Sequence, residues 1–207
     1  MTDQPIRLLL ADDQALVRGA LAALLDLEAD LTVVAQVGRG DEVVAAARDY
    51  RVDVALLDVE MPGLDGIAAA AALRAHVPTC RSLVVTTFGR PGYLRRALDA
   101  GASGFVVKDT PAEQLADAVR RVHRGLRVVD PELAVESLAV GTSPLTERER
   151  DVLVAASGGG TVADIARATF LSEGTVRNYL SAAMAKTGGR TRAEAVRIAD
   201  ENGWLLA

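Results

Sequence analysis

The segment Leu8-Leu9-Leu10-Ala11-Asp12-Asp13 places two carboxylates directly after a short apolar run. An apolar run without polar alternation is typical of a strand that is covered on both faces. Three later runs have the same form and also end at a residue with a chemically useful side chain: Val54–Leu57 before Asp58, Leu83–Val85 before Thr86, and Phe105–Val107 before Lys108. Each run therefore predicts a buried strand with a functional group at its carboxyl end.

Helical patterns alternate with these runs and with a further apolar run at Leu31–Val37. The predicted helices are Ala15–Leu27, Glu42–Arg48, Gly66–Ala75, Gly92–Ala100 and Ala112–Arg124. Five strand–helix repeats predict an α/β domain over residues 1–127, with a five-stranded parallel, doubly wound sheet of the flavodoxin-like kind.

The strand signal ends near residue 127, and we expect a linker over residues 128–143. Beyond it, residues 144–207 predict a small all-α domain of four helices. Thr146-Glu-Arg-Glu149 is a capping box that opens the first of these helices, and Gly158-Gly159-Gly160 ends it. The last helix is expected over Arg192–Asn202, capped by Thr191.

Composition excludes several classes of protein. Cys80 is the only cysteine, which rules out an internal disulfide and gives no cysteine spacing for a metal site. No apolar stretch approaches the roughly 18–20 residues of a membrane span, and the N-terminus lacks the pattern of a secretory signal. We expect a cytoplasmic protein without a membrane partner.

Lysine is rare in this chain: only Lys108 and Lys186 occur among 23 Lys and Arg residues. A lysine is a compact point charge that fits a small acidic pocket better than the planar guanidinium of arginine. Because ligands gather at the carboxyl ends of parallel strands, we expect Lys108 to meet Asp12, Asp13, Asp58 and Thr86 there.

Three carboxylates in one place repel one another unless a hard cation joins them, and Mg²⁺ suits such oxygen ligands. Asp13 and Asp58 are the expected direct ligands. Asp12 acts mainly through water, and the backbone carbonyl of Glu60 completes the protein's share. With Mg²⁺ and Lys108 neutralising charge, the Asp58 carboxylate can attack an incoming phosphoryl group and form an aspartyl phosphate.

A switch follows from this chemistry. Thr86 is expected to hydrogen-bond the new phosphoryl oxygens and draw its loop inward, which frees space for the ring of Phe105. Taken singly, each of these residues also fits a purely structural role, as a turn, cap or solvated side chain. Their joint position at four strand ends favours the functional interpretation.

The predicted helix from Glu173 has one apolar face and one polar face, and a short helix and a tight turn precede it. This is the pattern of a helix-turn-helix, whose second helix enters the major groove of DNA. The expected base readers are Arg177, Asn178 and Ser181, and the expected phosphate contacts are Tyr179, Lys186 and Arg192. Thr175 is a further expected DNA-binding residue. The alternative is a helical bundle with an ordinary solvated face.

The first part of the chain resembles the receiver domains of two-component response regulators over residues 6–124. The resemblance rests on Leu-Ala-Asp12-Asp13, Leu-Leu-Asp58-Val-Glu-Met-Pro62-Gly63, Val-Val-Thr86-Thr and Ala100-Gly101-Ala-Ser-Gly-Phe105-Val-Val-Lys108. It implies that Asp58 is the phosphoacceptor for a sensor histidine kinase, and that Thr86 and Phe105 form the switch pair.

The second part resembles the LuxR-type helix-turn-helix, through Leu145-Thr-Glu-Arg-Glu149, Leu171-Ser172-Glu-Gly-Thr175-Val176-Arg177-Asn178-Tyr179 and Lys186-Thr-Gly188. Together the two parts resemble the NarL/FixJ class of DNA-binding transcription regulators. This class implies a homodimer when phosphorylated, on paired half-sites of double-stranded promoter DNA. Leu16, Leu24, Val119 and Val122 on the first and fifth helices are the expected dimer contacts, and the fourth helix is the alternative face.

Two segments also resemble a subgroup that controls membrane-lipid desaturase expression with a thermosensing kinase: Thr87–Tyr93 and Gly174–Ser181. The chain departs from the LuxR-type pattern at Thr169 and Thr187, where leucine is usual. A buried threonine fills less volume and needs a hydrogen-bond partner, so we expect a less stable helical domain.

Two alternative functions were weighed. One is an aspartate-nucleophile phosphatase of the haloacid dehalogenase type, but that chemistry wants Asp-x-Asp after the first strand, and here the nucleophile follows the third. The other is a receiver that acts through protein contacts alone. We therefore predict a regulator that is not an enzyme.

Overall fold

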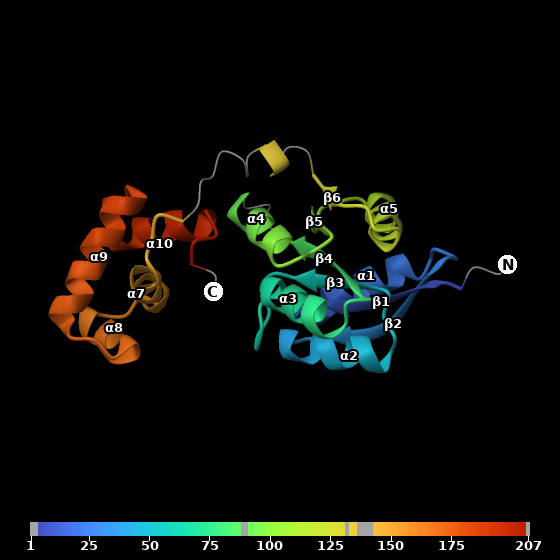
Figure 1. Ribbon diagram of the computed structural model, residues 1–207, viewed down its shortest axis with the longest axis horizontal. Coiled ribbons are helices and arrows are strands. Elements are labelled where there is room, and N and C mark those ends of the chain that lie inside the picture. The colour runs from blue at the N-terminus through green and yellow to red at the C-terminus, as the bar shows by residue number, and fades with distance from the viewer. Residues whose placement is uncertain (1–3, 88–90, 131–132, 136–142, 206–207) are drawn as a thin grey trace. The chain divides into compact units, whose positions relative to one another are not determined.

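The computed structural model describes residues 4–87, 91–130, 133–135 and 143–205. The chain divides into two compact units. The first contains the β-sheet with its helices, and the second contains four helices near the C-terminus (Figure 1).

The sheet of the first unit has six described strands, all parallel, in the order β2-β1-β3-β4-β5-β6. Their bounds are β1 Ile6–Ala11, β2 Leu31–Val37, β3 Val54–Asp58, β4 Arg81–Thr86, β5 Gly104–Val107 and β6 Val128–Val129. The parallel α/β architecture is confirmed, but the predicted count of five strands is wrong by one. The sixth strand has two residues, which is too short for any periodic signal in the sequence. It lies within the segment predicted as linker and pairs with β5.

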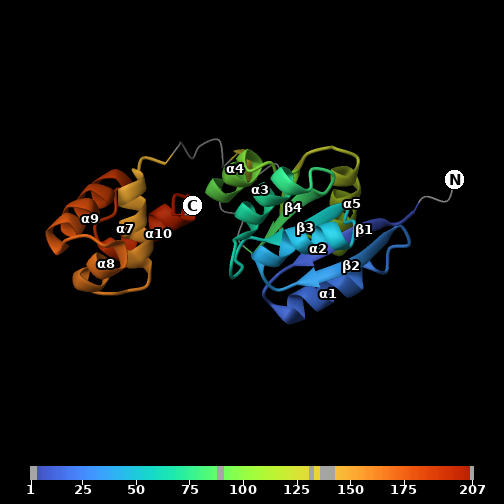
Figure 2. The same ribbon diagram turned by 60° about the horizontal axis from the view of Figure 1, so that its bottom comes forward.

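Five described helices cover the two faces of the sheet: α1 Ala15–Leu25, α2 Val43–Asp49, α3 Gly66–His76, α4 Pro91–Asp99 and α5 Ala112–His123. Alternate strand residues point to opposite faces. Leu8 and Leu10 of β1 accordingly join one buried cluster with Leu25 of α1 and Val119 of α5. Helices α2 and α3 lie side by side in both views (Figure 1, Figure 2).

The same cluster corrects part of the predicted dimer surface. Val119 and Val122 are predicted to contact a partner, but both are fully buried on the inner face of α5. They are core residues of this unit. By contrast, Leu16 and Leu24 of α1 are exposed, as a contact surface requires.

The second unit is built from α7 Glu147–Ser157, α8 Val162–Thr169, α9 Glu173–Thr187 and α10 Arg192–Glu201. The predicted capping box of Thr146 with Glu149 forms, and Thr161 with Asp164 forms another at the start of α8. The core of this unit is aliphatic and comes from all four helices: Val152, Leu153, Ile165, Val176, Leu180, Ala183, Ala195 and Ala199. The apolar face predicted for the helix from Glu173 is therefore the buried face of α9.

The two threonines that replace leucine are hydrogen-bonded within their own helices. The Thr169 hydroxyl donates to the carbonyl of Ile165 at 2.7 Å, and the Thr187 hydroxyl donates to that of Ala183 at 2.9 Å. Both residues are only half-buried. These bonds satisfy both hydroxyl groups, so the difference from leucine at these positions is a smaller apolar volume. The lower stability of the domain stays a prediction.

A buried ion pair links α7 to α9. Glu149 is 5% exposed, and its Oε2 accepts from Lys186 Nζ at 2.7 Å and from the Thr146 N–H at 2.7 Å. Burial alone would raise the pKa of Glu149, but the bonds from Lys186 and Thr146 outweigh burial and lower it. The pair therefore stabilises the folded unit above the unfolded-state pKa of roughly 4.3, and this stabilisation is lost as pH falls through the lower folded pKa.

Replacing Lys186 by Met leaves the Glu149 carboxylate buried with one partner fewer. Since Lys186 keeps a third of its side chain in solvent, we expect a loss of about 1–2 kcal/mol in the free energy of unfolding at pH 7. Urea unfolding followed by the fluorescence of Trp204, the chain's only tryptophan, measures this unit specifically.

Arg190→Met is the matched control, because that side chain is exposed and the described structure gives it no side-chain bond. The difference between Lys186→Met and wild type should shrink as the pH is lowered below about 4. Equal stability of the two variants at pH 7 would contradict a structural role for the pair.

Candidate functional site

Strand register brings the predicted residues to one edge of the sheet. Ala11 pairs with Leu57, so Asp12 and Asp58 follow adjacent positions, and Thr86 pairs with Val107, next to Lys108. Asp12, Asp58 and Thr86 are buried, at 3%, 4% and 4% exposure. The strands thus place acidic and basic groups together in a largely dehydrated site.

The ammonium group of Lys108 bridges two of the carboxylates. Its Nζ lies 2.8 Å from Asp12 Oδ2 and 2.9 Å from Asp58 Oδ2. The Lys108 backbone N–H also donates to the Thr86 carbonyl at 2.7 Å, which fixes the base of the side chain. Burial alone would lower the pKa of Lys108, but the two carboxylates outweigh it and raise the pKa, so the group stays charged.

Asp58 has the opposite balance. Burial raises its pKa, Lys108 lowers it, and the neighbouring charge of Asp12 raises it again, so that the pKa lies above the usual value for aspartate. Burial and the Asp12 charge thus disfavour the ionised form of Asp58 more than Lys108 favours it. A second cation beside the group would stabilise the ionised form.

Asp12, Asp13 and Asp58 bring carboxylate oxygens to within 4.8 Å of one another, and Asp13 is exposed while the other two are buried. This set of hard oxygen donors fits a divalent cation that also keeps waters. Both carboxylate oxygens of Asp12 already have a partner: Oδ1 accepts the Gln14 N–H at 2.8 Å, and Oδ2 forms an ion pair with Lys108. Glu60 is exposed just after β3, and the role of its carbonyl stays a prediction.

The sequence analysis missed two residues that position this site. Gly66 opens α3 directly behind Asp58, where a Cβ atom would lie 2.0 Å from the Asp58 carbonyl oxygen. Its N–H donates to Val59 at 3.0 Å. A side chain there would displace the Asp58 backbone, and the Asp65-Gly66 start of the helix was a signal for this close approach. Arg18 of α1 donates to the Asp12 carbonyl, and no pattern in the sequence announced that contact.

The predicted switch residues occupy neighbouring strands. Thr86 ends β4, and Phe105 lies in β5 opposite Val84 with its ring fully buried. The structure therefore shows the pair with the ring inside the fold.

Residues predicted to read DNA bases lie on the solvent side of α9. Arg177, Asn178 and Ser181 are exposed. Arg177 donates to Glu173 at 2.7 Å within the same helix, and the Thr175 hydroxyl lies 2.8 Å from that of Ser172, the N-cap residue. Asn178 and Ser181 have no side-chain partner among the described residues, so both are available to a ligand.

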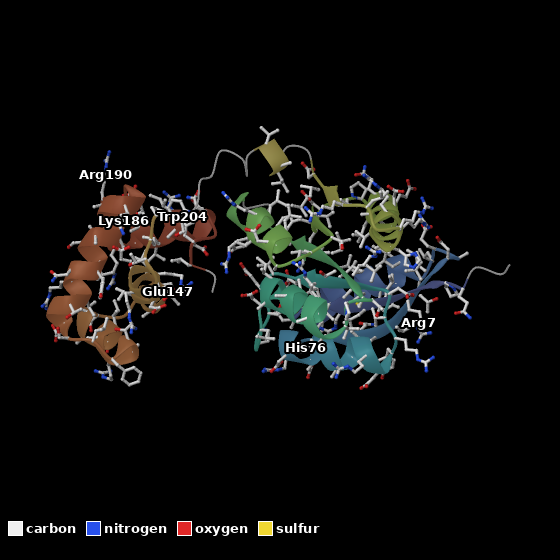
Figure 3. The ribbon with its side chains drawn as sticks, viewed as in Figure 1. Arg7, His76, Glu147, Lys186, Arg190 and Trp204 are labelled. Atoms are coloured by element: carbon white, nitrogen blue, oxygen red, sulfur yellow. The ribbon has the colours of Figure 1, made fainter. Side chains whose placement is uncertain are left out.

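The predicted phosphate contacts have structural partners. Lys186 is paired with Glu149, and Arg192 donates to the Gly160 carbonyl at 2.7 Å. Tyr179 is half-buried against the core of the unit. Figure 3 shows that Arg190, which the sequence analysis did not single out, extends its side chain away from the helices into solvent.

The described helices include none that is both long and apolar enough to cross a bilayer.

Two family descriptions match the chain. "Response regulator receiver domain" matches residues 8–120, and "Bacterial regulatory proteins, luxR family" matches residues 143–199. Together they cover most of the first unit and most of the second.

Full-length relatives agree with both matches. The chain is 42% identical over 200 residues to "Uncharacterized transcriptional regulatory protein YvfU" of Bacillus subtilis (strain 168), covering 97% of this chain and 100% of that protein. It is 40% identical over 200 residues to "Transcriptional regulatory protein DesR" of the same organism, covering 97% and 99%. Among solved structures, the response regulator ChrA of a heme-sensing two-component system is 32% identical, with a TM-score of 0.58 over 95% of this chain and 97% of that chain.

YvfU and DesR are almost equally similar to this chain, so they do not separate the desaturase subgroup from its neighbours. That assignment stays a prediction, and residues 88–90 of one supporting segment lie outside the described residues. The class itself is clear, because both families and both relatives point to it. The chain is a two-component response regulator of the NarL/FixJ class, a phosphorylation-dependent transcription regulator with a receiver domain and a LuxR-type helix-turn-helix.

Proposed function

We propose that Asp58 is the phosphoacceptor of this regulator and that Asp12, Asp13 and Asp58 hold Mg²⁺ during transfer. The observation that carries the proposal is the position of Lys108 Nζ, within 2.9 Å of both Asp12 and Asp58. Mg²⁺ supplies a second positive charge that neutralises the incoming phosphoryl oxygens.

In the proposed transfer, an Asp58 oxygen attacks the phosphorus of a kinase phosphohistidine. A P–O bond forms as the P–N bond breaks, and the histidine nitrogen keeps the electron pair of that bond. Lys108 offers its ammonium to a phosphoryl oxygen, because phosphoryl transfer depends mainly on positioning and charge neutralisation. The chain modifies only itself, which agrees with a regulator rather than a phosphatase.

The signal then passes along β4 and β5. We propose that Thr86 donates its hydroxyl to the Asp58 phosphoryl group and moves towards it. The Phe105 ring is already buried in this structure, so the movement proposed is that of Thr86 and not of the ring. A local change of charge is thereby converted into a change of surface shape near the ends of these strands.

Asp58→Asn removes the nucleophile, and we expect no phosphoryl uptake from acetyl phosphate with Mg²⁺, measured on phosphate-affinity gels and by intact mass. Asp13→Asn keeps the nucleophile but loses a metal ligand. We expect it to need at least about tenfold more Mg²⁺ for half-maximal phosphorylation. Asp49→Asn, at the exposed end of α2, is the control. Phosphorylation of the Asp58→Asn variant would refute the assignment.

We further propose that the phosphorylated chain forms a homodimer through α1. The helix carries an exposed apolar stripe at helical spacing, and its large members Leu16 and Leu24 are 86% and 45% exposed. Leu27, just beyond the end of α1, is 80% exposed. Gly19, Ala20 and Ala23 lie on the same stripe and are also exposed. Small residues between leucines let a second helix approach closely, and covering the stripe removes apolar surface from water.

Leu16→Glu places a charge at the most exposed leucine of this surface, at the start of α1. With beryllofluoride, the wild type should become a dimer at micromolar concentration in light scattering, while Leu16→Glu should dimerise at least about tenfold more weakly, because a carboxylate would be buried without a partner. Tyr50→Glu is the matched control, since Tyr50 is 50% exposed on another part of this unit. If Leu16→Glu dimerises as the wild type does, the interface does not include Leu16, and the α4 face is the alternative.

For DNA, we propose that α9 enters the major groove and that Asn178 and Ser181 read bases. Asparagine pairs bidentately with adenine, whereas a lone hydroxyl is less selective. Arg190, exposed just beyond α9, is the better placed phosphate contact, since Lys186 is already paired with Glu149. We expect Arg177 to contact a base only after its ion pair with Glu173 breaks.

Asn178→Ala should weaken binding to a promoter fragment by about tenfold or more while leaving non-specific DNA affinity unchanged, since a base contact is lost. Arg190→Gln should weaken binding to both and reduce the salt slope by about one. Fluorescence anisotropy between 50 and 200 mM salt separates the two effects. Equal weakening of specific and non-specific binding by Asn178→Ala would exclude a base-reading role.

A further inference from the structure

Three arginines line a cavity of about 250 Å³ at the amino-terminal edge of the sheet, opposite the phosphoacceptor site. Arg74 comes from α3, Arg81 begins β4, and Arg127 precedes β6. Ser82 and Ser103 contribute to the same lining, and Ser82 is 4% exposed. The cavity therefore combines three guanidinium groups with hydroxyl groups.

These arginines have no direct ionic partner in the described part of the chain. The lining contains no acidic residue, and within the described ranges none of the three guanidinium groups makes an ion pair or a side-chain hydrogen bond. Arg120 in the same unit, by contrast, is held by Glu28 at 2.6 Å and by Asp30 at 2.7 Å. All three side chains are exposed, so solvent screens their mutual repulsion, and an anion in the cavity would reduce it further.

Two glycines make room for these side chains. Gly101 has φ +95°, and a Cβ atom there would lie 2.3 Å from Cδ of Arg74. Gly125 has φ +88°, and a Cβ there would lie 3.2–3.4 Å from the guanidinium of Arg81. Glycine is also the usual residue at positive-φ positions after a helix, and at these two it leaves space for the arginine side chains.

We propose that this cavity binds a small anion that carries a diphosphate group. Guanidinium forks match phosphate oxygens bidentately, and three of them suit a ligand with several negative charges. The lining has no aromatic ring on which a base could stack, so recognition rests on the diphosphate itself. The site is separate from Asp58, because β4 starts at Arg81 and ends at Thr86, about 17 Å apart at strand rise.

The test uses the full chain with inorganic diphosphate in EDTA, without Mg²⁺ and at constant ionic strength, by isothermal titration calorimetry. We expect saturable binding with one site, and Arg127→Gln should weaken it at least about tenfold. Arg124→Gln is the matched control: it removes the same charge three residues away, but Arg124 lies outside the lining and acts on Asp30 instead. Asp58→Asn should bind as wild type does, which keeps this test independent of the phosphoacceptor assignment.

A parallel titration with ADP identifies the source of the diphosphate. Tighter binding of ADP than of inorganic diphosphate assigns the cavity to a nucleotide, and weaker binding assigns it to a free diphosphate or a smaller ester. No saturable binding of either ligand would overturn the proposal. Equal weakening by Arg127→Gln and Arg124→Gln would also overturn it, because general charge attraction would then explain the binding.

Discussion

The ammonium group of Lys108, held between Asp12 and Asp58, is the interaction on which the receiver unit depends. Two buried carboxylates at adjacent strand ends would repel each other strongly at low dielectric, and one compact cation satisfies both at 2.8 and 2.9 Å. Burial and Asp12 keep the pKa of Asp58 raised. One ammonium group offsets only one of the two carboxylate charges, and the remaining charge suits the Mg²⁺ proposed for this site.

In the second unit, the chain's other lysine also pairs with a buried carboxylate. Lys186 reaches the buried carboxylate of Glu149 at 2.7 Å and joins the recognition helix to the capping box of α7. Both lysines of an arginine-rich chain thus neutralise buried carboxylates, where a point charge on a flexible stem fits better than a planar fork. On the exposed side of α9, Asn178 and Ser181 keep side chains without a partner among the described residues, which suits the base contacts proposed for them.

Charge is also divided along the strands of the sheet. Carboxylates gather at the carboxyl edge, around Asp58, and unpaired guanidinium groups gather at the amino edge, around Arg81. The strands between the two edges are apolar and buried, so a closely packed core separates the two edges. The two proposed sites, for a phosphoryl group with Mg²⁺ and for a small anion, therefore lie at opposite edges of the sheet.

The sequence by itself determined the parallel α/β unit, the four-helix unit and the identity of the pocket residues, because buried strands and capping boxes leave local patterns and strand ends share an edge. It could not show that Val119 and Val122 are core, that Lys186 is committed to Glu149, or that β6 exists. Nor could it show Gly66 against Asp58, or Arg74, Arg81 and Arg127 around one cavity. These facts depend on contacts between residues far apart in the chain, or on strands too short for a period, so only the packing of the tertiary structure decided them.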